Sequence, residues 1–101
     1  MSIYFLLFKV GNYTLASLIE EVKNIEKKNK KLEIRIKENL NICVDEVIDF
    51  VLVSLKDIYK IPPFLKKHIK YESICGLINL KDKIIPIIKL DKFYKEMGIW
   101  D

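Results

Sequence analysis

The sequence predicts an all-β domain, a small barrel built from short antiparallel strands with a short C-terminal helix. Hydrophobic residues make up 50% of the 101 residues and charged residues 32%, which is typical of an ordered globule rather than a disordered chain. Short apolar or alternating segments recur along the chain with turn residues between them, and little of it has helical spacing. A chain of this length has room for one compact core, so we expect a single domain over residues 1–101.

The first predicted element is a β-hairpin. Residues 3–10 are apolar and aromatic, Gly11 provides turn chemistry together with Asn12, and residues 13–19 resume the apolar pattern. The next segment, EEVKNIEKK, places two apolar residues among charges with a spacing that fits either a strand or a helical turn. We expect a strand after a short turn.

The middle of the chain predicts further strands. KLEIRIK, residues 31–37, alternates most clearly, with Leu32, Ile34 and Ile36 on one side and Glu33 and Arg35 on the other. This pattern indicates a half-buried strand. Residues 42–44 and 48–55 favour strands through their β-branched and aromatic content. The IPP motif at residues 61–63 ends the regular structure, and we expect the lysine-rich stretch around His68 to cross the surface.

GLINLKDKIIPIIKL, residues 76–90, predicts a second hairpin over an exposed charged turn. Pro86 interrupts its outgoing strand. Proline has no backbone N–H for a sheet ladder, so a strand that contains it lies at an edge, begins there or is bulged. Beyond the hairpin, Asp91 is the expected N-cap of a short helix over KFYKEM, which Gly98 ends.

The charge and cysteine patterns disfavour several functions. The formal net charge of +4 arises from 18 basic and 14 acidic residues, and every basic residue except Arg35 is a lysine. Nucleic-acid readers rely on arginine for bidentate contacts, so we interpret the basic charge as solvated surface. Cys43 and Cys75 lie in apolar runs, which predicts buried small side chains. With the lone His68 they provide too few ligands for a metal site.

No catalytic constellation is visible in the sequence, and we expect neither an enzyme nor a bound cofactor. His68 has no recognisable nucleophile motif beside it, and the three glycines form no phosphate-binding loop. The N-terminal IYFLLFKV is too short to span a bilayer and contains Lys9. We therefore expect no membrane insertion and a cytoplasmic location.

Three features together resemble the CheW-like domain, the adaptor of bacterial chemotaxis arrays. The first is an internal echo, in which placing Val22 on Val47 aligns LASLIEEVKNI with LNICVDEVIDF and indicates one strand-turn-strand unit used twice. The second is the VDEV step at residues 44–47, and the third is the closing hairpin. The positions that match the family pattern in order are Val44, Asp45, Val47, Pro62, Pro63, Gly76, Asn79, Leu80, Ile85 and Pro86.

The resemblance covers nearly the whole chain and implies an SH3-like barrel and a non-catalytic adaptor. Such an adaptor docks on the regulatory domain of the histidine kinase CheA, on methyl-accepting chemoreceptors, or on both. The candidate protein-binding residues that it implies are Val44, Asp45, Ile78, Asn79, Lys81 and Asp82. Asp45 also fits a structural role as the cap of a turn between strands, and Val44 and Ile78 fit a barrel core equally well.

The chain departs from the family pattern in two places. A full adaptor has two five-stranded barrels and is longer, whereas this chain has two strand-turn-strand openings and one closing hairpin, so we expect a shortened member. The family turn Asn-Leu-Arg-Gly is Asn79-Leu80-Lys81-Asp82 here. Lysine cannot reproduce the planar donor fork of arginine, which weakens the receptor contact implied at this turn.

Two alternatives remain open at this point. If one barrel lacks its closing hairpin, the N-terminal hairpin has an unpaired edge that a second copy covers in a strand-exchanged homodimer. An OB-like barrel that binds single-stranded nucleic acid is a different class, with Tyr4, Phe5, Phe8 and Tyr13 as stacking platforms. Interleaved aromatic residues in a strand are more often core, so the adaptor is favoured and nucleic acid is the less favoured partner.

Overall fold

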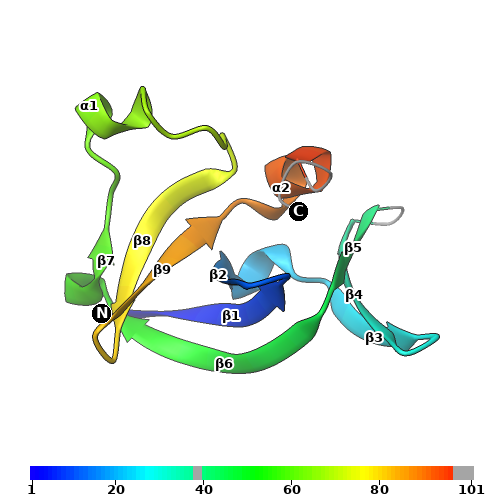
Figure 1. Ribbon diagram of the computed structural model, residues 1–101. Coiled ribbons are helices and arrows are strands. Elements are labelled where there is room, and N and C mark those ends of the chain that lie inside the picture. The colour runs from blue at the N-terminus through cyan, green and yellow to red at the C-terminus, as the bar shows by residue number, and fades with distance from the viewer. Residues whose placement is uncertain (38–39, 97–101) are drawn as a thin grey trace.

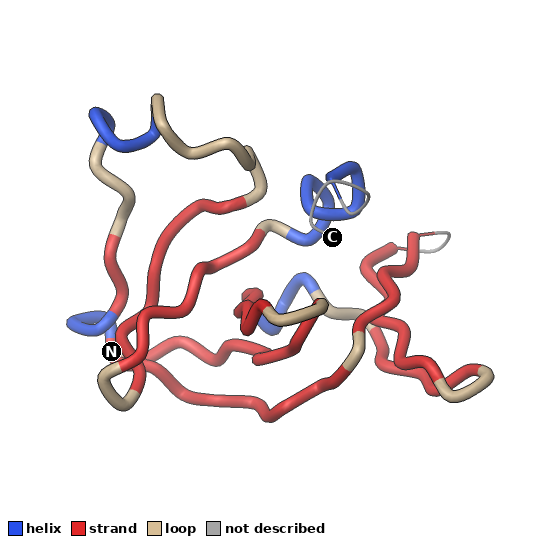
Figure 2. The backbone as a smooth tube through the Cα atoms, in the orientation of Figure 1, coloured by secondary structure: helices blue, strands red, loops and turns tan. Residues whose placement is uncertain are grey.

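The computed structural model describes residues 1–37 and 40–96 (Figure 1). The strands are β1 (Ser2–Val10), β2 (Tyr13–Leu18), β3 (Asn24–Lys28), β4 (Lys31–Lys37), β5 (Leu40–Val44), β6 (Glu46–Ser54), β7 (Ile58–Tyr59), β8 (Ile74–Leu80) and β9 (Lys83–Ile88). Short helices join or follow them: the 3₁₀ helices η1 (Ile19–Glu21) and η2 (Leu55–Asp57), and the α-helices α1 (Pro63–Lys66) and α2 (Leu90–Glu96). The predicted all-β class with a short C-terminal helix is confirmed, as the predominance of strand in Figure 2 makes plain.

The strands form two curled sheets that together make a half-barrel. The larger sheet has the order β6-β1-β2-β9-β8-β7, and the smaller one has the order β3-β4-β5. All neighbours are antiparallel except β2 and β9, which run parallel and share a single registered pair, Ala16 with Ile87. In Figure 1, β3-β4-β5 stands beyond one end of β1 and β6, and β8 and β9 rise from the other end.

Strand β1 is buried on both faces, which explains its continuous apolar sequence. One face contributes Leu6, Phe8 and Val10 to a cluster that also contains side chains of the smaller sheet and α2, including Ile34, Ile42 and Phe93. The other face contributes Phe5 and Leu7 to a cluster with β8 and β9, including Ile78 and Ile85. Each large apolar side chain that is fully buried stabilises the fold by roughly 1.5–3 kcal/mol. Two small cores share β1 as their common wall.

In the described part of the chain, three hairpins are closed by two-residue turns. Gly11 has a φ of 60° while Asn12 does not share the left-handed region, which is the pattern of a type II′ turn and confirms the predicted turn. Lys81 and Asp82 have φ values of 50° and 65°, so the closing hairpin uses a type I′ turn, as the β3–β4 hairpin does. The left-handed conformation costs a residue with a side chain roughly 1–2 kcal/mol.

Pro86 lies in an internal strand, because β9 stands between β8 and β2. Leu80 and Lys83 close the two-residue turn, so alternation makes Pro86 and its partner Leu77 a pair without mutual hydrogen bonds. The nitrogen of Pro86 therefore faces β2, where the only registered pair is one residue further on, at Ile87. The missing N–H therefore removes no bond to β8, and it lies on the side of the β2–β9 ladder, which has that single pair. Strand β9 is internal and not the edge strand that the proline allowed us to expect.

The cysteines differ from expectation, because both are exposed rather than buried. Cys43 lies between the buried Ile42 and Val44 on β5, so its side chain points to the opposite face of that strand. Cys75 is the extra residue where the register of β8 shifts between Ile74 and Gly76. Apolar neighbours in sequence do not bury a side chain in either position.

The predicted C-terminal helix is present, but its N-cap is not Asp91. Helix α2 already includes Leu90, so Asp91 lies in the first turn, where its Oδ1 accepts a hydrogen bond from the backbone N–H of Lys92 at 2.9 Å. The predicted stop at Gly98 lies outside the described residues. The lysine-rich crossing contains the one-turn helix α1, which the sequence pattern did not indicate.

The two segments aligned by the internal echo do not form the same secondary-structure elements. Val22 follows η1, whereas Val47 lies within β6 opposite Phe8. A repeated strand-3₁₀-strand unit exists in another alignment, because η1 and η2 each follow an extended residue, Leu18 and Ser54. The premise of the strand-exchanged dimer also differs from the structure, since β1 has β2 and β6 as neighbours and β2 has β1 and β9.

Candidate protein-binding surface

Two of the predicted contact residues belong to the core. Val44 is 5% exposed and Ile78 is 0% exposed, and they lie in different apolar clusters. A side chain that is already packed cannot contact a partner unless the domain opens. Val44 and Ile78 are therefore corrected from surface contacts to core residues, which was the alternative reading of both.

Asp45 has the structural role expected of a turn cap. Its carboxylate Oδ2 accepts a hydrogen bond from the backbone N–H of Gly11 at 2.5 Å, and its own N–H donates to the backbone oxygen of Lys9 at 2.9 Å. Asp45 stands in the break between β5 and β6, so these two bonds tie that break to the β1–β2 turn. The side chain connects parts of the chain that are distant in sequence.

The predicted contact residues of the closing hairpin lie at or near the surface. Lys81 and Asp82 are exposed at the turn, and Asn79 is half-buried just before it. The structure does not bring the two predicted groups into one hollow: Val44 and Asp45 line a small one of 140 Å³ near Cys43, whereas Lys81 lines a larger groove elsewhere. The predicted residues therefore do not form a single site.

This larger hollow, which we call the β9 groove, is open and mainly apolar and has a volume of 710 Å³. It lies between the closing hairpin, the β1–β2 turn and β6, and it is lined by Leu7, Asn12, Tyr13, Thr14, Ile48, Leu80, Lys81, Lys83, Ile84, Ile85 and Pro86. Three of the lining side chains are large, apolar and well exposed: Ile84 at 61%, Tyr13 at 50% and Ile48 at 42%. The charged lining residues, Lys81 and Lys83, are both basic. An apolar surface with a basic rim fits an amphipathic partner with acidic residues.

Sequence reasoning did not assign Ile84, Tyr13 or Ile48 to a protein-binding surface, although Tyr13 was considered as a stacking platform for nucleic acid. In KIIPII every position except the first is apolar, so no alternation distinguishes the inward Ile85 from the outward Ile84. Ile48 is the extra residue at the register shift of β6 against β1. No sequence pattern predicts this shift. The available signal for the outward side of β9 is the alternating pattern counted from the two-residue turn, which requires the turn type to be known.

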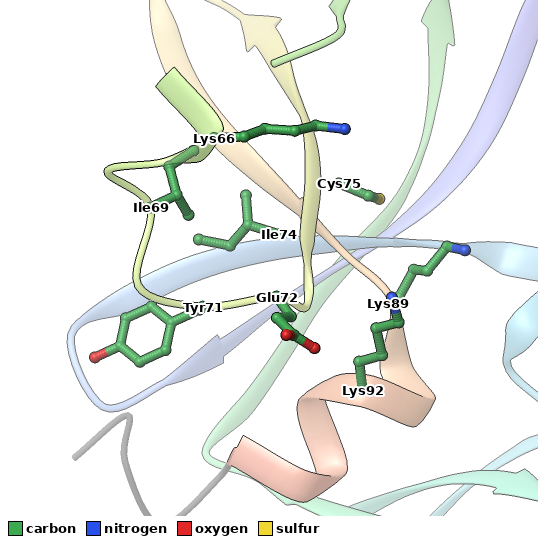
Figure 3. Close-up of a pocket in the computed structure, with 8 residues that line it drawn as sticks. All are labelled: Lys66, Ile69, Tyr71, Glu72, Ile74, Cys75, Lys89 and Lys92. Carbon is green, nitrogen blue, oxygen red and sulfur yellow. The ribbon is translucent and has the colours of Figure 1, made fainter. Parts of the chain in front are cut away.

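A second hollow of 480 Å³ lies beneath α1 and beside α2 (Figure 3). Lys66, Lys89 and Lys92 line it together with Glu72 and Cys75. The thiol of Cys75 is partly covered although the residue is exposed, and its Sγ lies 3.5 Å from the backbone oxygen of Ile87, to which it donates. Partial burial raises the pKa of the Cys75 thiol, and the nearby carboxylate of Glu21 acts in the same direction. Burial, followed by the neighbouring Asp91 carboxylate, likewise raises the pKa of Glu21.

The raised pKa predicts slow alkylation of Cys75. In a Cys43→Ser variant the folded protein should react with iodoacetamide more slowly than the same chain in urea, because less thiolate is present at a given pH. Mass spectrometry of labelling between neutral and alkaline pH should place the midpoint of the rate profile at higher pH in the folded chain. Coincident profiles for the folded and unfolded chains would contradict the electrostatic argument.

The aromatic residues do not form the stacking platforms that a nucleic-acid barrel needs. Phe5 and Phe8 are 1% and 0% exposed, so that assignment is wrong for both. Tyr4 and Tyr13 are exposed.

Among residues 1–37 and 40–96, no group of three or more His, Cys, Asp or Glu side chains is placed to hold a metal ion. In the same part of the chain, no helix has the length and apolar character needed to cross a membrane.

The two curled sheets, the shared central strand and the C-terminal helix define a fold that is also seen in a scaffolding protein. The structure is similar to the crystal structure of the scaffolding protein TtCheW from Thermoanaerobacter tengcongensis, with a TM-score of 0.64 and 15% sequence identity. The similarity covers 93% of this chain and 92% of that chain. No protein-family model matches the sequence, and a search of curated proteins finds no significant match. The chain has a CheW-like fold.

Proposed function

We propose that this protein is a non-catalytic adaptor in bacterial chemotaxis, working in the cytoplasm as one CheW-like domain without a cofactor. The observation that carries the proposal is the β9 groove, an exposed apolar surface with a basic rim, on a chain with the fold of a scaffolding protein. A scaffold acts through surfaces that bind other proteins, and exposed apolar side chains gathered in one groove are what such binding requires.

The proposed partners are the regulatory domain of a CheA histidine kinase, a chemoreceptor, or both. The exposed apolar residues of the groove are Ile84, Tyr13 and Ile48. An amphipathic segment would place its apolar side against these residues and its acidic side against Lys81 and Lys83. Burial of the apolar side chains would supply most of the affinity, and the lysines would favour the encounter and the orientation.

We expect Ile84→Glu to weaken binding strongly. Ile84 is 61% exposed, so the substitution costs the free fold little, but in the complex it would place a carboxylate against an apolar and acidic partner. Loss of an interface anchor costs about 2 kcal/mol or more, which is a weakening of roughly thirtyfold. Titration calorimetry with the CheA regulatory domain and with a chemoreceptor fragment from the same source would measure the change.

The matched control is Phe64→Glu on α1, which is 69% exposed and does not line the β9 groove. The affinity of this variant should equal that of the wild type.

The double substitution Lys81→Asn with Asp82→Gly removes both charges of the turn but keeps a sequence that type I′ turns favour, and it should weaken binding by several-fold. Wild-type affinity in Ile84→Glu would show that the groove is not the docking surface, and no binding by the wild type would remove the adaptor function.

A further inference from the structure

Strand β6 is an unpaired edge of the larger sheet. It is 9 residues long, from Glu46 to Ser54, and stands at one end of the strand order with β1 as its neighbour. Edge strands of this length are usually shortened, charged or covered, because their free N–H and C=O groups pair with other strands. In Figure 1, β6 runs along the outside of the half-barrel, and in the described part of the chain no other strand pairs with its outer side.

The directions of the peptide groups in β6 follow from its ladder with β1. Val10 and Tyr13 flank the two-residue turn and form a hydrogen-bonded pair, so even-numbered residues of β1 bond to β2 and odd-numbered ones bond to β6. The bond from the N–H of Leu55 to the oxygen of Met1, 3.1 Å, agrees with this alternation. Val51 and Val53 therefore bond to β1, and the peptide groups of Phe50 and Leu52 point outward. The outward N–H of Phe50 donates to Oδ1 of the adjacent Asp49 at 2.8 Å, a local bond that a pairing strand would replace.

The same edge carries an exposed apolar strip. Phe50 is 48% exposed, Leu52 is 53% exposed, and Tyr4, which pairs with Leu52 on β1, is 53% exposed. The three side chains share one face, because Phe50 and Leu52 are two residues apart and Tyr4 is directly opposite Leu52. Outward peptide groups that no described strand pairs with, and an apolar strip at the same edge, are together the requirements for a further strand.

We propose that a second copy of this chain occupies this edge, with β6 pairing antiparallel to β6 of the other copy around a two-fold axis at Val51. In this register Phe50 faces Leu52 of the second copy, and Leu52 faces its Phe50. Asp49 faces Val53 of the second copy, so no like charges are opposed. The two larger sheets then continue into each other, and the apolar strips lie side by side on one face.

Other registers of the β6–β6 pair are less favourable. An axis at Asp49 would place two carboxylates directly opposite each other, which destabilises a strand pair. An axis at Phe50 would pair Ile48 with Leu52 of the second copy, although the register shift between Leu7 and Phe8 interrupts the regular alternation of β6 at Ile48. The segment from Asp49 to Ser54 is regular, and an axis at Val51 or at Leu52 pairs five of its residues. Of these two axes, the one at Val51 places Phe50 opposite Leu52, whereas the one at Leu52 places Phe50 opposite Ser54.

Sizing with light scattering on the full chain tests the dimer. The wild type should change from monomer to dimer across the micromolar range, and Phe50→Lys should remain monomeric with unchanged circular dichroism. The matched control is Tyr59→Lys on β7, the opposite edge of the same sheet, which is also 48% exposed and should dimerise normally. A wild type that stays monomeric, or a Phe50→Lys variant that still dimerises, overturns the proposal.

Single cysteines test the register in a Cys43→Ser, Cys75→Ser background. Val51→Cys should form a disulfide-linked dimer fastest under mild oxidation, because opposed residues without mutual hydrogen bonds have Cα atoms about 4.5 Å apart, within disulfide range. Faster crosslinking of Asp49→Cys or Phe50→Cys would reject the Val51 axis. Self-association needs no chemotaxis partner, so this result is independent of the adaptor function.

Discussion

Phe8→Ala is expected to lower the free energy of unfolding by about 3–5 kcal/mol, the range for removing a buried aromatic side chain. Phe8 is 0% exposed, and its ring lies 6.3 Å from that of Phe93 at an interplanar angle of 59°. It belongs to the cluster that holds the larger sheet, the smaller sheet and α2 together. The cavity would therefore loosen three elements, and small domains have only about 5–15 kcal/mol of total stability.

Urea denaturation followed by circular dichroism measures this change. Phe8→Leu keeps most of the apolar volume and should show a smaller loss, which protects the test if Phe8→Ala does not fold. Phe64→Ala is the control, since Phe64 is 69% exposed and its removal should change stability by no more than about 0.5 kcal/mol. A loss for Phe8→Ala no larger than that of Phe64→Ala would mean that the two sheets do not share this core.

Asp45→Ala is expected to lower the free energy of unfolding by about 1.5–3 kcal/mol, because hydrogen bonds to charged groups are stronger than neutral ones. The carboxylate of Asp45 accepts the N–H of Gly11, whose left-handed φ of 60° starts the β1–β2 turn. Without the carboxylate, that N–H loses its charged acceptor. The turn would then be less firmly tied to the break between β5 and β6.

Asp45→Asn is the matched variant, because its side-chain oxygen still accepts the bond but carries no charge. Its stability should lie between those of the wild type and Asp45→Ala. Binding measurements on the same variants separate the two roles considered for Asp45. If Asp45→Asn binds a partner as the wild type does, the residue acts through the fold; if stability is unchanged in Asp45→Ala, the structural role is refuted.

The β9 groove and the β6 edge are separate surfaces, and we propose a different partner for each. Ile84 belongs to the closing hairpin, whereas Phe50 and Leu52 belong to the other end of the strand order. Ile48 is the residue that connects them, since it lines the groove and lies on β6. A dimer through β6 would present two grooves from one assembly, and a bivalent adaptor gains avidity when its partner is also repeated.

The features that the sequence predicted correctly are those that depend on interactions between residues close together in the chain. The Gly11 turn, the alternation of KLEIRIK, the closing hairpin and the C-terminal helix each depend on neighbours a few residues away. The capping role of Asp45 was also available, because a short carboxylate between two strands commonly accepts a turn N–H. These features give the all-β class and most of the strand order along the chain.

Side-chain burial and strand partners depend on the folded whole. In β1 and β9 nearly every residue is apolar, so no period distinguishes the two faces, and packing against the second sheet and the hairpin determines which side chains are covered. Cys43 and Val44 are neighbours in one apolar run, yet alternation on β5 exposes the first and buries the second. The β9 groove and the free edge of β6 arise from pairings such as β1 with β6 and β2 with β9, which join distant segments. Such pairings are determined by how much apolar surface the two cores bury in the complete fold. This quantity cannot be calculated from a short segment of the sequence.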